Sequence, residues 1–116
     1  MHASTFAWRR APEVREVDPV TLDTLLAGPT PVVVEFWNNG CSPCRALEAV
    51  MRDVEDEYPD VRFVTVNADR NPELVQRFGV LGTPTLLIMT GGVEQERLMG
   101  ARPKTAIRAS LDRAGA

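Results

Sequence analysis

The sequence predicts an α/β fold in which a mixed central sheet of four to five strands is flanked by helices on both faces. Short β-branched runs alternate with segments whose apolar residues recur every three to four positions, as in strands joined by crossover helices. The Gly91-Gly92 pair separates the last two runs and predicts an antiparallel hairpin. The 116 residues suffice for one domain with its own core. We assign residues 17–116 to this domain and residues 1–16 to an N-terminal arm or lead-in strand.

The first half of the chain predicts one helix and one buried strand before the cysteines. Asp18 is a capping residue and Pro19 suits a first helical turn, so a helix begins here and ends at Gly28. Its apolar face is expected to consist of Val20, Leu22, Leu25 and Leu26. The β-branched run at residues 31–37 is bounded by turn residues, which predicts a central strand.

The second half predicts a helix, a strand, a second helix, a hairpin and a closing helix. These elements fall at residues 41–58, 60–67, 72–78, 85–90, 93–99 and 103–114. The helix at residues 41–58 presents one apolar face, made of Leu47, Val50, Met51, Val54 and Tyr58. Asn71 is expected to cap the helix that starts at Pro72, and Gly79 to end it.

Composition and charge exclude two classes of partner. The formal net charge of -3 disfavours a nucleic-acid binder, which presents a basic face. No apolar run approaches the roughly 20 residues that cross a bilayer. Arg9-Arg10 could belong to an export signal, but no apolar segment follows the pair. We therefore expect a cytoplasmic protein that binds neither nucleic acid nor membrane.

The two cysteines, Cys41 and Cys44, are three positions apart. A disulfide between them closes a very small loop and cannot link distant parts of a fold, so chemistry or metal binding explains the pair better than cross-linking. Zinc requires four ligands, and His2 is the only histidine. We expect no metal site; an inert pair is the remaining alternative.

The position of the cysteine pair favours redox chemistry. Cys41 stands where a buried strand gives way to a helix, and the free N–H groups and dipole of a helix N-terminus stabilise a thiolate. Pro43 suits the first helical turn. Cys44 lies about one turn further on the same face. We therefore expect Cys41 to be the nucleophile and Cys44 the resolving thiol.

Several segments of the chain resemble the thioredoxin family, in matching order over residues 17–113. They are Val33-Val34-Glu35-Phe36-Trp37, Cys41-Ser42-Pro43-Cys44-Arg45, Asn67-Ala68-Asp69, Phe78-Gly79-Val80, Gly82-Thr83-Pro84-Thr85-Leu86, Gly91-Gly92 and Gly100. Several motifs at matching spacing are more specific than the cysteines alone. The resemblance implies a thioredoxin fold and a protein dithiol–disulfide oxidoreductase.

The resemblance also implies a substrate groove beside the cysteines. Pro84 should follow a cis peptide bond and lie against them, and the backbone at Thr83 should pair with an extended substrate segment. The substrate-binding residues implied in this way are Trp37, Ser42, Pro43, Thr83, Pro84 and Gly100.

Five positions depart from the family pattern, and one of them is Ala49, which stands where many thioredoxins have a proline that kinks the helix. Glu35 stands where most thioredoxins have a buried aspartate; burial raises the pKa of a carboxyl group, and we expect Glu35 to accept the proton of Cys44. Ser42 replaces a glycine, and its hydroxyl is expected to donate a hydrogen bond to the Cys41 thiolate. Gly40 replaces a tryptophan, which removes an apolar contact surface. Thr65 replaces a common lysine near the buried acid.

The direction of electron flow is expected to be reducing. Strongly oxidising relatives carry a histidine between the cysteines, and this chain carries Ser42-Pro43. We expect a monomeric reductant of protein disulfides that has no cofactor beyond its own cysteine pair and is recycled by a flavoprotein disulfide reductase. The alternatives are a thiol oxidase or isomerase on the same fold, and a non-catalytic interaction module.

Overall fold

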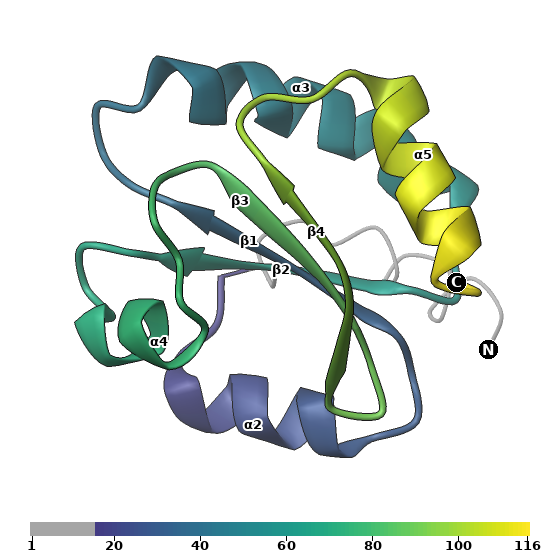
Figure 1. Cartoon of the computed structure of the whole chain (residues 1–116), viewed down its shortest axis with the longest axis horizontal. Coiled ribbons are helices and arrows are strands. Elements are labelled where there is room, and N and C mark those ends of the chain that lie inside the picture. Colours follow the sequence, from purple (N-terminus) through teal and green to yellow (C-terminus); the bar gives the residue numbers. More distant parts are fainter. Residues whose placement is uncertain (1–15) are drawn as a thin grey trace, which may run out of the picture.

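The computed structural model describes residues 16–116, and in this part of the chain four strands form one mixed sheet between two layers of helices (Figure 1). In chain order the elements are α2 (Pro19–Ala27), β1 (Val32–Trp37), α3 (Ser42–Glu57), β2 (Arg62–Asn67), α4 (Pro72–Arg77), β3 (Thr85–Thr90), β4 (Val93–Met99) and α5 (Lys104–Arg113). The strand order is β2-β1-β3-β4; β1 and β2 are parallel, and β3 is antiparallel to β1 and β4. The predicted fold class is confirmed. Of the helices between residues 16 and 116, none has the length and apolar character needed to span a bilayer.

The sheet is extended beside β2 by the first described residues. Glu16 forms an isolated parallel bridge with Thr65, and the Val17 N–H donates to the Thr65 carbonyl at 3.0 Å. Val17 is buried and joins the core. The rest of the predicted arm or lead-in strand falls on residues 1–15, which lie outside the described residues.

Side chains alternate between the two faces of β1, as the period of a strand requires. Val32, Val34 and Phe36 pack in the core cluster on the α2 and α4 side. Val33 packs in the cluster formed with α3 and α5. Because Glu35 lies two residues after Val33, it belongs to the face that α3 covers. The alternation of β1 therefore places this acid beneath the helix that begins at the cysteines.

Two sequence predictions about helix residues differ from the structure: the one about Val20 is wrong, and the one about Asn71 holds for its position but not for its side-chain bond. Val20 is 74% exposed, because Leu22 and Leu26, four residues apart, define the buried face of α2 and Val20 points away from it. Asn71 is the N-cap residue of α4, as expected, but its side chain makes no capping bond there. Its Nδ2 instead donates to the Asn67 carbonyl at 2.9 Å, which ties the start of α4 to the end of β2.

The hairpin between β3 and β4 confirms the Gly-Gly prediction. Gly91 and Gly92 both have positive φ, 58° and 77°, the combination that a two-residue turn of the primed type requires. The turn leaves Thr90 opposite Val93 in the ladder. A register shift between Ile88 and Met89 interrupts the pairing further along.

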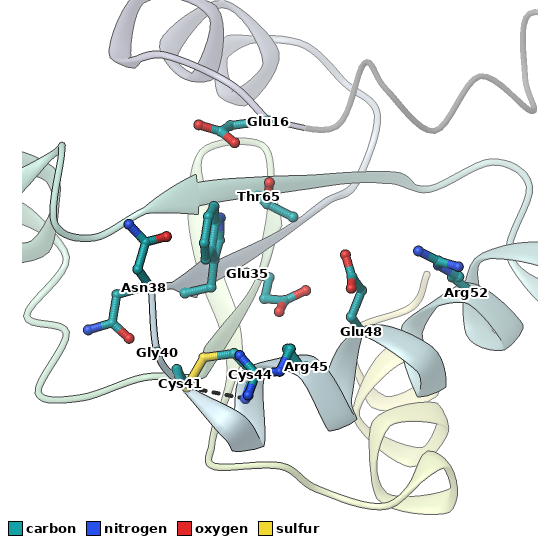
Figure 2. A pocket seen from close by; sticks show the side chains of 12 residues that line it. Glu16, Glu35, Asn38, Gly40, Cys41, Cys44, Arg45, Glu48, Arg52 and Thr65 are labelled. Carbon is teal, nitrogen blue, oxygen red and sulfur yellow. Dashed lines mark hydrogen bonds between the residues drawn. A yellow bond between two sulfur atoms is a disulfide. The ribbon is translucent and has the colours of Figure 1, made fainter.

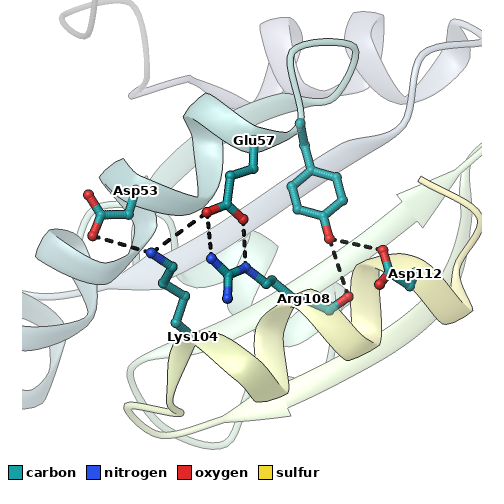
Figure 3. A network of polar contacts seen from close by, with 6 residues as sticks. Asp53, Glu57, Lys104, Arg108 and Asp112 are labelled. Atoms are coloured by element: carbon teal, nitrogen blue, oxygen red, sulfur yellow. Dashed lines mark hydrogen bonds and ion pairs between the residues drawn. The ribbon is translucent and has the colours of Figure 1, made fainter.

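Charged side chains join α3 to α5 (Figure 3). The Arg108 guanidinium donates twice to the Glu57 carboxylate, at 2.6 Å each, and the Lys104 ammonium lies 3.6 Å from both Glu57 and Asp53. The hydrogen bonds from Arg108 hold the pKa of Glu57 below its ordinary value. This network fixes the C-terminal helix against the helix that carries the cysteines.

Glu57→Gln is expected to lower Tm by a few degrees at neutral pH and to have less effect in acid. The folded-state pKa of Glu57 is depressed, so its contribution is present above the unfolded value of about 4.3 and is lost as pH falls through the lower folded value. Thermal unfolding of both proteins between neutral pH and pH values below that of free glutamate tests this. The control is Asp56→Asn, an exposed residue on the same helix that takes part in none of the ion pairs seen among residues 16–116. A Tm difference independent of pH, or equal to that of the control, contradicts the prediction.

Candidate active site

Cys41 and Cys44 form a disulfide at the N-terminus of α3, with their Cα atoms 5.2 Å apart (Figure 2). Cys41 is the N-cap residue, and its sulfur accepts a hydrogen bond from the Cys44 N–H at 3.2 Å. Pro43 lies in the first turn, where a missing N–H leaves no bond unmade. The first turn of α3 therefore directs its N–H groups at Cys41, the arrangement that stabilises a thiolate.

The two sulfur-bearing residues differ in exposure. Cys41 is partly exposed, whereas Cys44 retains only 5% of its accessible surface. A thiolate must be reached by a substrate disulfide before it can attack it, and a resolving thiol needs only to reach its partner cysteine. The exposure supports the expected division of roles between Cys41 and Cys44.

The loop before β3 lies beside the disulfide. The Thr83–Pro84 peptide bond is cis, and the Thr83 hydroxyl oxygen is 3.7 Å from the Cys41 sulfur. β3 begins at Thr85, and within residues 16–116 the backbone of Thr83 takes part in no backbone hydrogen bond. The Gly100 N–H donates to the Pro84 carbonyl at 2.8 Å. The loop is thus held from one side, while the Thr83 backbone can pair with an extended segment.

Arg97 on β4 fixes the chain that leads into this loop. Its guanidinium donates to the carbonyls of Phe78 and Gly79 at the end of α4, and it also pairs with the Glu94 carboxylate at 2.8 Å. The hydrogen bonds that Arg97 donates to the Glu94 carboxylate raise the pKa of Arg97. These hydrogen bonds fix the position of the segment that runs from the end of α4 to Thr83.

A pocket of about 430 Å³ opens behind the cysteines, between β1, β2 and α3. It is lined by Glu16, Glu35, Trp37, Asn38, Asn39, Gly40, Cys41, Cys44, Arg45, Glu48, Arg52 and Thr65. Glu35 is 4% exposed and lies opposite Thr65 in the β1–β2 register. Figure 2 shows the carboxylates of Glu35 and Glu48 turned into the same space. The pocket therefore brings the buried acid and the resolving cysteine together.

Three charged pocket residues, Glu16, Glu48 and Arg52, were missed at the sequence level, and two of them, Glu48 and Arg52, belong to α3. These two follow Cys44 at intervals of four residues, so their side chains and that of Cys44 share one face of α3. That spacing was the available signal. The helix thereby brings a second cation, Arg52, to the pocket that Arg45 also lines.

The remaining predicted site residues lie around the disulfide with different contacts. Trp37 lines the pocket, whereas Ser42 and Pro43 are exposed in the first turn of α3. The Ser42 hydroxyl accepts a hydrogen bond from Arg45 at 3.4 Å. In this disulfide form the Cys44 N–H donates to the Cys41 sulfur and the Thr83 hydroxyl oxygen lies 3.7 Å from that sulfur, so the bond from Ser42 to a thiolate stays a prediction. Across residues 16–116, no three His, Cys, Asp or Glu side chains are arranged to hold a metal ion.

A cysteine pair at a helix N-terminus, set against a cis-proline loop in a mixed sheet, defines a class of protein: the thiol–disulfide oxidoreductases of α/β fold. The family model for thioredoxin matches residues 13–113. The chain belongs to the thioredoxin family.

Individual relatives agree with this assignment. Thioredoxin 1 of Synechococcus elongatus is 37% identical over 90 residues, which cover 77% of this chain and 84% of that protein. Thioredoxin M2, chloroplastic, of Arabidopsis thaliana is 34% identical over 103 residues, which cover 87% of this chain and 55% of the relative; the chain thus spans about half of its length. The X-ray structure of Fasciola hepatica thioredoxin superposes with a TM-score of 0.79 at 28% identity, covering 86% of this chain and 98% of that one.

The family fixes the class of reaction. Thioredoxins are protein disulfide oxidoreductases, and this chain has their fold and an intact cysteine pair. The resemblance of the motifs is confirmed along with the cis bond at Pro84. The reading as a non-catalytic interaction module is not favoured by these findings.

Proposed function

We propose that the chain reduces protein disulfides. The Cys41 thiolate attacks one sulfur of a substrate disulfide, so that a new S–S bond forms and the other substrate sulfur leaves as a thiolate. Cys44 then gives up its proton and attacks the Cys41 sulfur, which releases the second substrate thiol. Two electrons pass from the cysteine pair to the substrate, and the chain is left as the Cys41–Cys44 disulfide.

The observation that carries this proposal is the difference in access around the disulfide. Cys41 is partly exposed beside a loop whose Thr83 backbone is available for strand-like pairing, and Cys44 is buried behind it. Backbone pairing gives affinity with little demand on substrate sequence. The substrate class that this geometry suits is an extended protein segment containing a disulfide.

The charges of the pocket support the reducing direction. A cysteine pair becomes more oxidising as its reduced, thiolate form is stabilised. Here the carboxyl groups of Glu16, Glu35 and Glu48 line the pocket against the guanidinium groups of Arg45 and Arg52. The pocket therefore offers the thiolate no net positive surroundings, and this favours the disulfide form of the chain, which is the property of a reductant.

The reduction potential tests the direction. Equilibration with glutathione redox buffers is expected to give a value near the roughly -270 mV of reducing relatives. A value near the roughly -120 mV of strongly oxidising relatives would overturn the proposal in favour of a thiol oxidase. The same preparation should reduce insulin disulfides in the presence of a chemical dithiol.

We also propose Glu35 as the proton acceptor for Cys44. It is almost fully buried, lines the same pocket as Cys44, and belongs to the sheet face under α3. A base must lie within reach of the proton that it removes, and this pocket contains both groups. The β2 residue opposite Glu35 is the neutral Thr65.

Recycling requires an electron donor, because each turnover leaves the cysteines oxidised. We propose a flavoprotein disulfide reductase as this donor, with no cofactor in the chain other than its cysteine pair. A monomer presents Cys41 freely to both donor and substrate. A reductant acts where a donor keeps it reduced, and on this basis we propose the cytoplasm. Steady NADPH consumption with insulin and a thioredoxin reductase tests the donor.

A further inference from the structure

Three residues from separate segments meet at the exposed side of the disulfide. Asn38 follows β1, Cys41 is the N-cap of α3, and Thr83 precedes the cis bond. The Thr83 hydroxyl oxygen is 2.7 Å from Asn38 Oδ1 and 3.7 Å from Cys41 Sγ. All three residues are partly exposed. One hydroxyl therefore stands between two acceptors of different chemistry.

We propose that Asn38 is a positioning residue for disulfide exchange: it holds the Thr83 hydroxyl in the disulfide form and turns it toward Cys41 when that sulfur becomes a thiolate. The inference rests on the proposed role of Cys41 as the attacking sulfur. Asn38 does not touch the substrate in this mechanism. It acts through Thr83.

The Thr83 hydroxyl carries a single proton, so it can donate to Asn38 or to Cys41 but not to both at once. A threonine hydroxyl donates one proton and accepts through its oxygen. In the disulfide form the sulfur is a weak acceptor, and the 2.7 Å contact to Asn38 is an ordinary O–H···O distance. A thiolate is charged, and hydrogen bonds to charged acceptors are shorter and about twice as strong. Reduction therefore favours donation to Cys41 over donation to Asn38.

An asparagine can serve both states because its amide carries an acceptor and a donor. With Oδ1 toward Thr83 it accepts the hydroxyl proton, as in the disulfide form. After a half-turn of the amide, its Nδ2 donates to the hydroxyl oxygen while the hydroxyl donates to the thiolate. The resulting series of hydrogen bonds runs from Asn38 through Thr83 to Cys41, and each hydrogen bond polarises the next.

Other charges also act on the Cys41 thiolate and must be held constant. Glu35 faces the site from β1, Arg45, Glu48 and Arg52 face it from α3, and Glu16 faces it from the segment before α2. Each of them is unchanged in the variants below. Differences among these variants therefore report on Asn38 and Thr83.

The test measures how readily Cys41 ionises in the reduced full-length chain. Thiolate absorbance against pH gives its pKa, and the rate of alkylation by iodoacetamide at neutral pH gives its thiolate fraction. Thr83→Val removes the hydroxyl, and alkylation is expected to slow roughly tenfold, the lower end of what one lost hydrogen bond to a charged acceptor is worth. Thr83→Ser keeps the hydroxyl and should retain most of the rate.

Asn38→Ala should slow alkylation by a smaller factor than Thr83→Val, and Asn38→Asp by a larger factor than Asn38→Ala. The aspartate adds a negative charge and accepts the hydroxyl proton in both redox states. In the Thr83→Val background, Asn38→Ala should have no further effect. The neighbouring Asn39→Ala, which also lines the pocket, is the matched control and should leave the rate unchanged.

Equal effects of Asn38→Ala with and without the Thr83 hydroxyl would overturn the inference, since Asn38 would then act independently of Thr83. So would an effect of Asn39→Ala as large as that of Asn38→Ala. The alkylation rate does not depend on a protein substrate. If the wild type reduces insulin but the alkylation rates show that Asn38 and Thr83 act independently, this inference is wrong and the proposed function still holds.

Discussion

Cys44→Ser is expected to convert the chain from a catalyst into a trap for its substrates. The partly exposed Cys41 still attacks, but the serine hydroxyl cannot break the mixed disulfide that results, because the thiolate is the species that performs the exchange. Multiple-turnover reduction of insulin should fall to the uncatalysed background. Non-reducing electrophoresis of a lysate should show covalent complexes, and a dithiol should separate them by reducing the mixed disulfide.

Cys41→Ser is the matched control for this experiment. The remaining thiol, Cys44, is 5% exposed and lies behind residue 41. We therefore expect the variant to lose activity and to accumulate no covalent complexes. Equal trapping by both variants, or stronger trapping by Cys41→Ser, would reverse the assigned roles of the two cysteines. The identity of the trapped proteins defines the substrates.

Glu35→Gln is expected to slow disulfide reduction by roughly 10²-fold, the lower end of what a positioned base contributes. Glutamine preserves the shape of the side chain but cannot accept the proton of Cys44. The first step, attack by Cys41, should change little, because Cys41 carries its negative charge before the substrate arrives. Rapid-mixing experiments should therefore show normal formation and prolonged survival of the mixed disulfide.

The pH dependence separates a proton acceptor from a residue that only supports the fold. In the wild type the resolving step should accelerate as Glu35 loses its proton, and the variant should lack this limb of the profile. Glu48→Gln removes a carboxylate from the same pocket at an exposed position. It should keep the limb. A uniform loss of rate at every pH in Glu35→Gln, or an equal loss in Glu48→Gln, contradicts the assignment.

The course of the elements could be predicted because local signals agreed with the tertiary structure. Asp18 caps α2 through a bond to the Thr21 N–H, and Gly91-Gly92 forms the hairpin turn. Val20 and Asn71 show where local reasoning fails. The apolar Val20 could belong to either side of α2 until packing selected the face of Leu22, and the amide of Asn71 donates to the Asn67 carbonyl, four residues earlier at the end of β2, instead of capping α4.

The site shows the same division. Cys41 and Cys44 could be placed at a helix N-terminus from their neighbours in the sequence. The four-residue spacing of Cys44, Glu48 and Arg52 places them on one face of a helix. The neighbouring sequence did not show which residues of other elements would line the same pocket. The bond between Asn38 and Thr83 joins residues 45 positions apart, and the sequence showed at Asn38 only the end of a strand.

The sequence by itself determined the alternation of strands and helices, the pair of sulfurs at the front of α3, and membership in a family through motifs in order. These properties depend on backbone preferences and on neighbours within a few residues. Only the tertiary structure decided how far each cysteine is exposed, that Glu48 and Arg52 share the pocket of Glu35, and which hydroxyl stands between Asn38 and Cys41. Burial, register and hydrogen-bond partners are set where segments far apart in the chain pack together, because a side chain's surroundings exist only once the sheet and its helices have assembled.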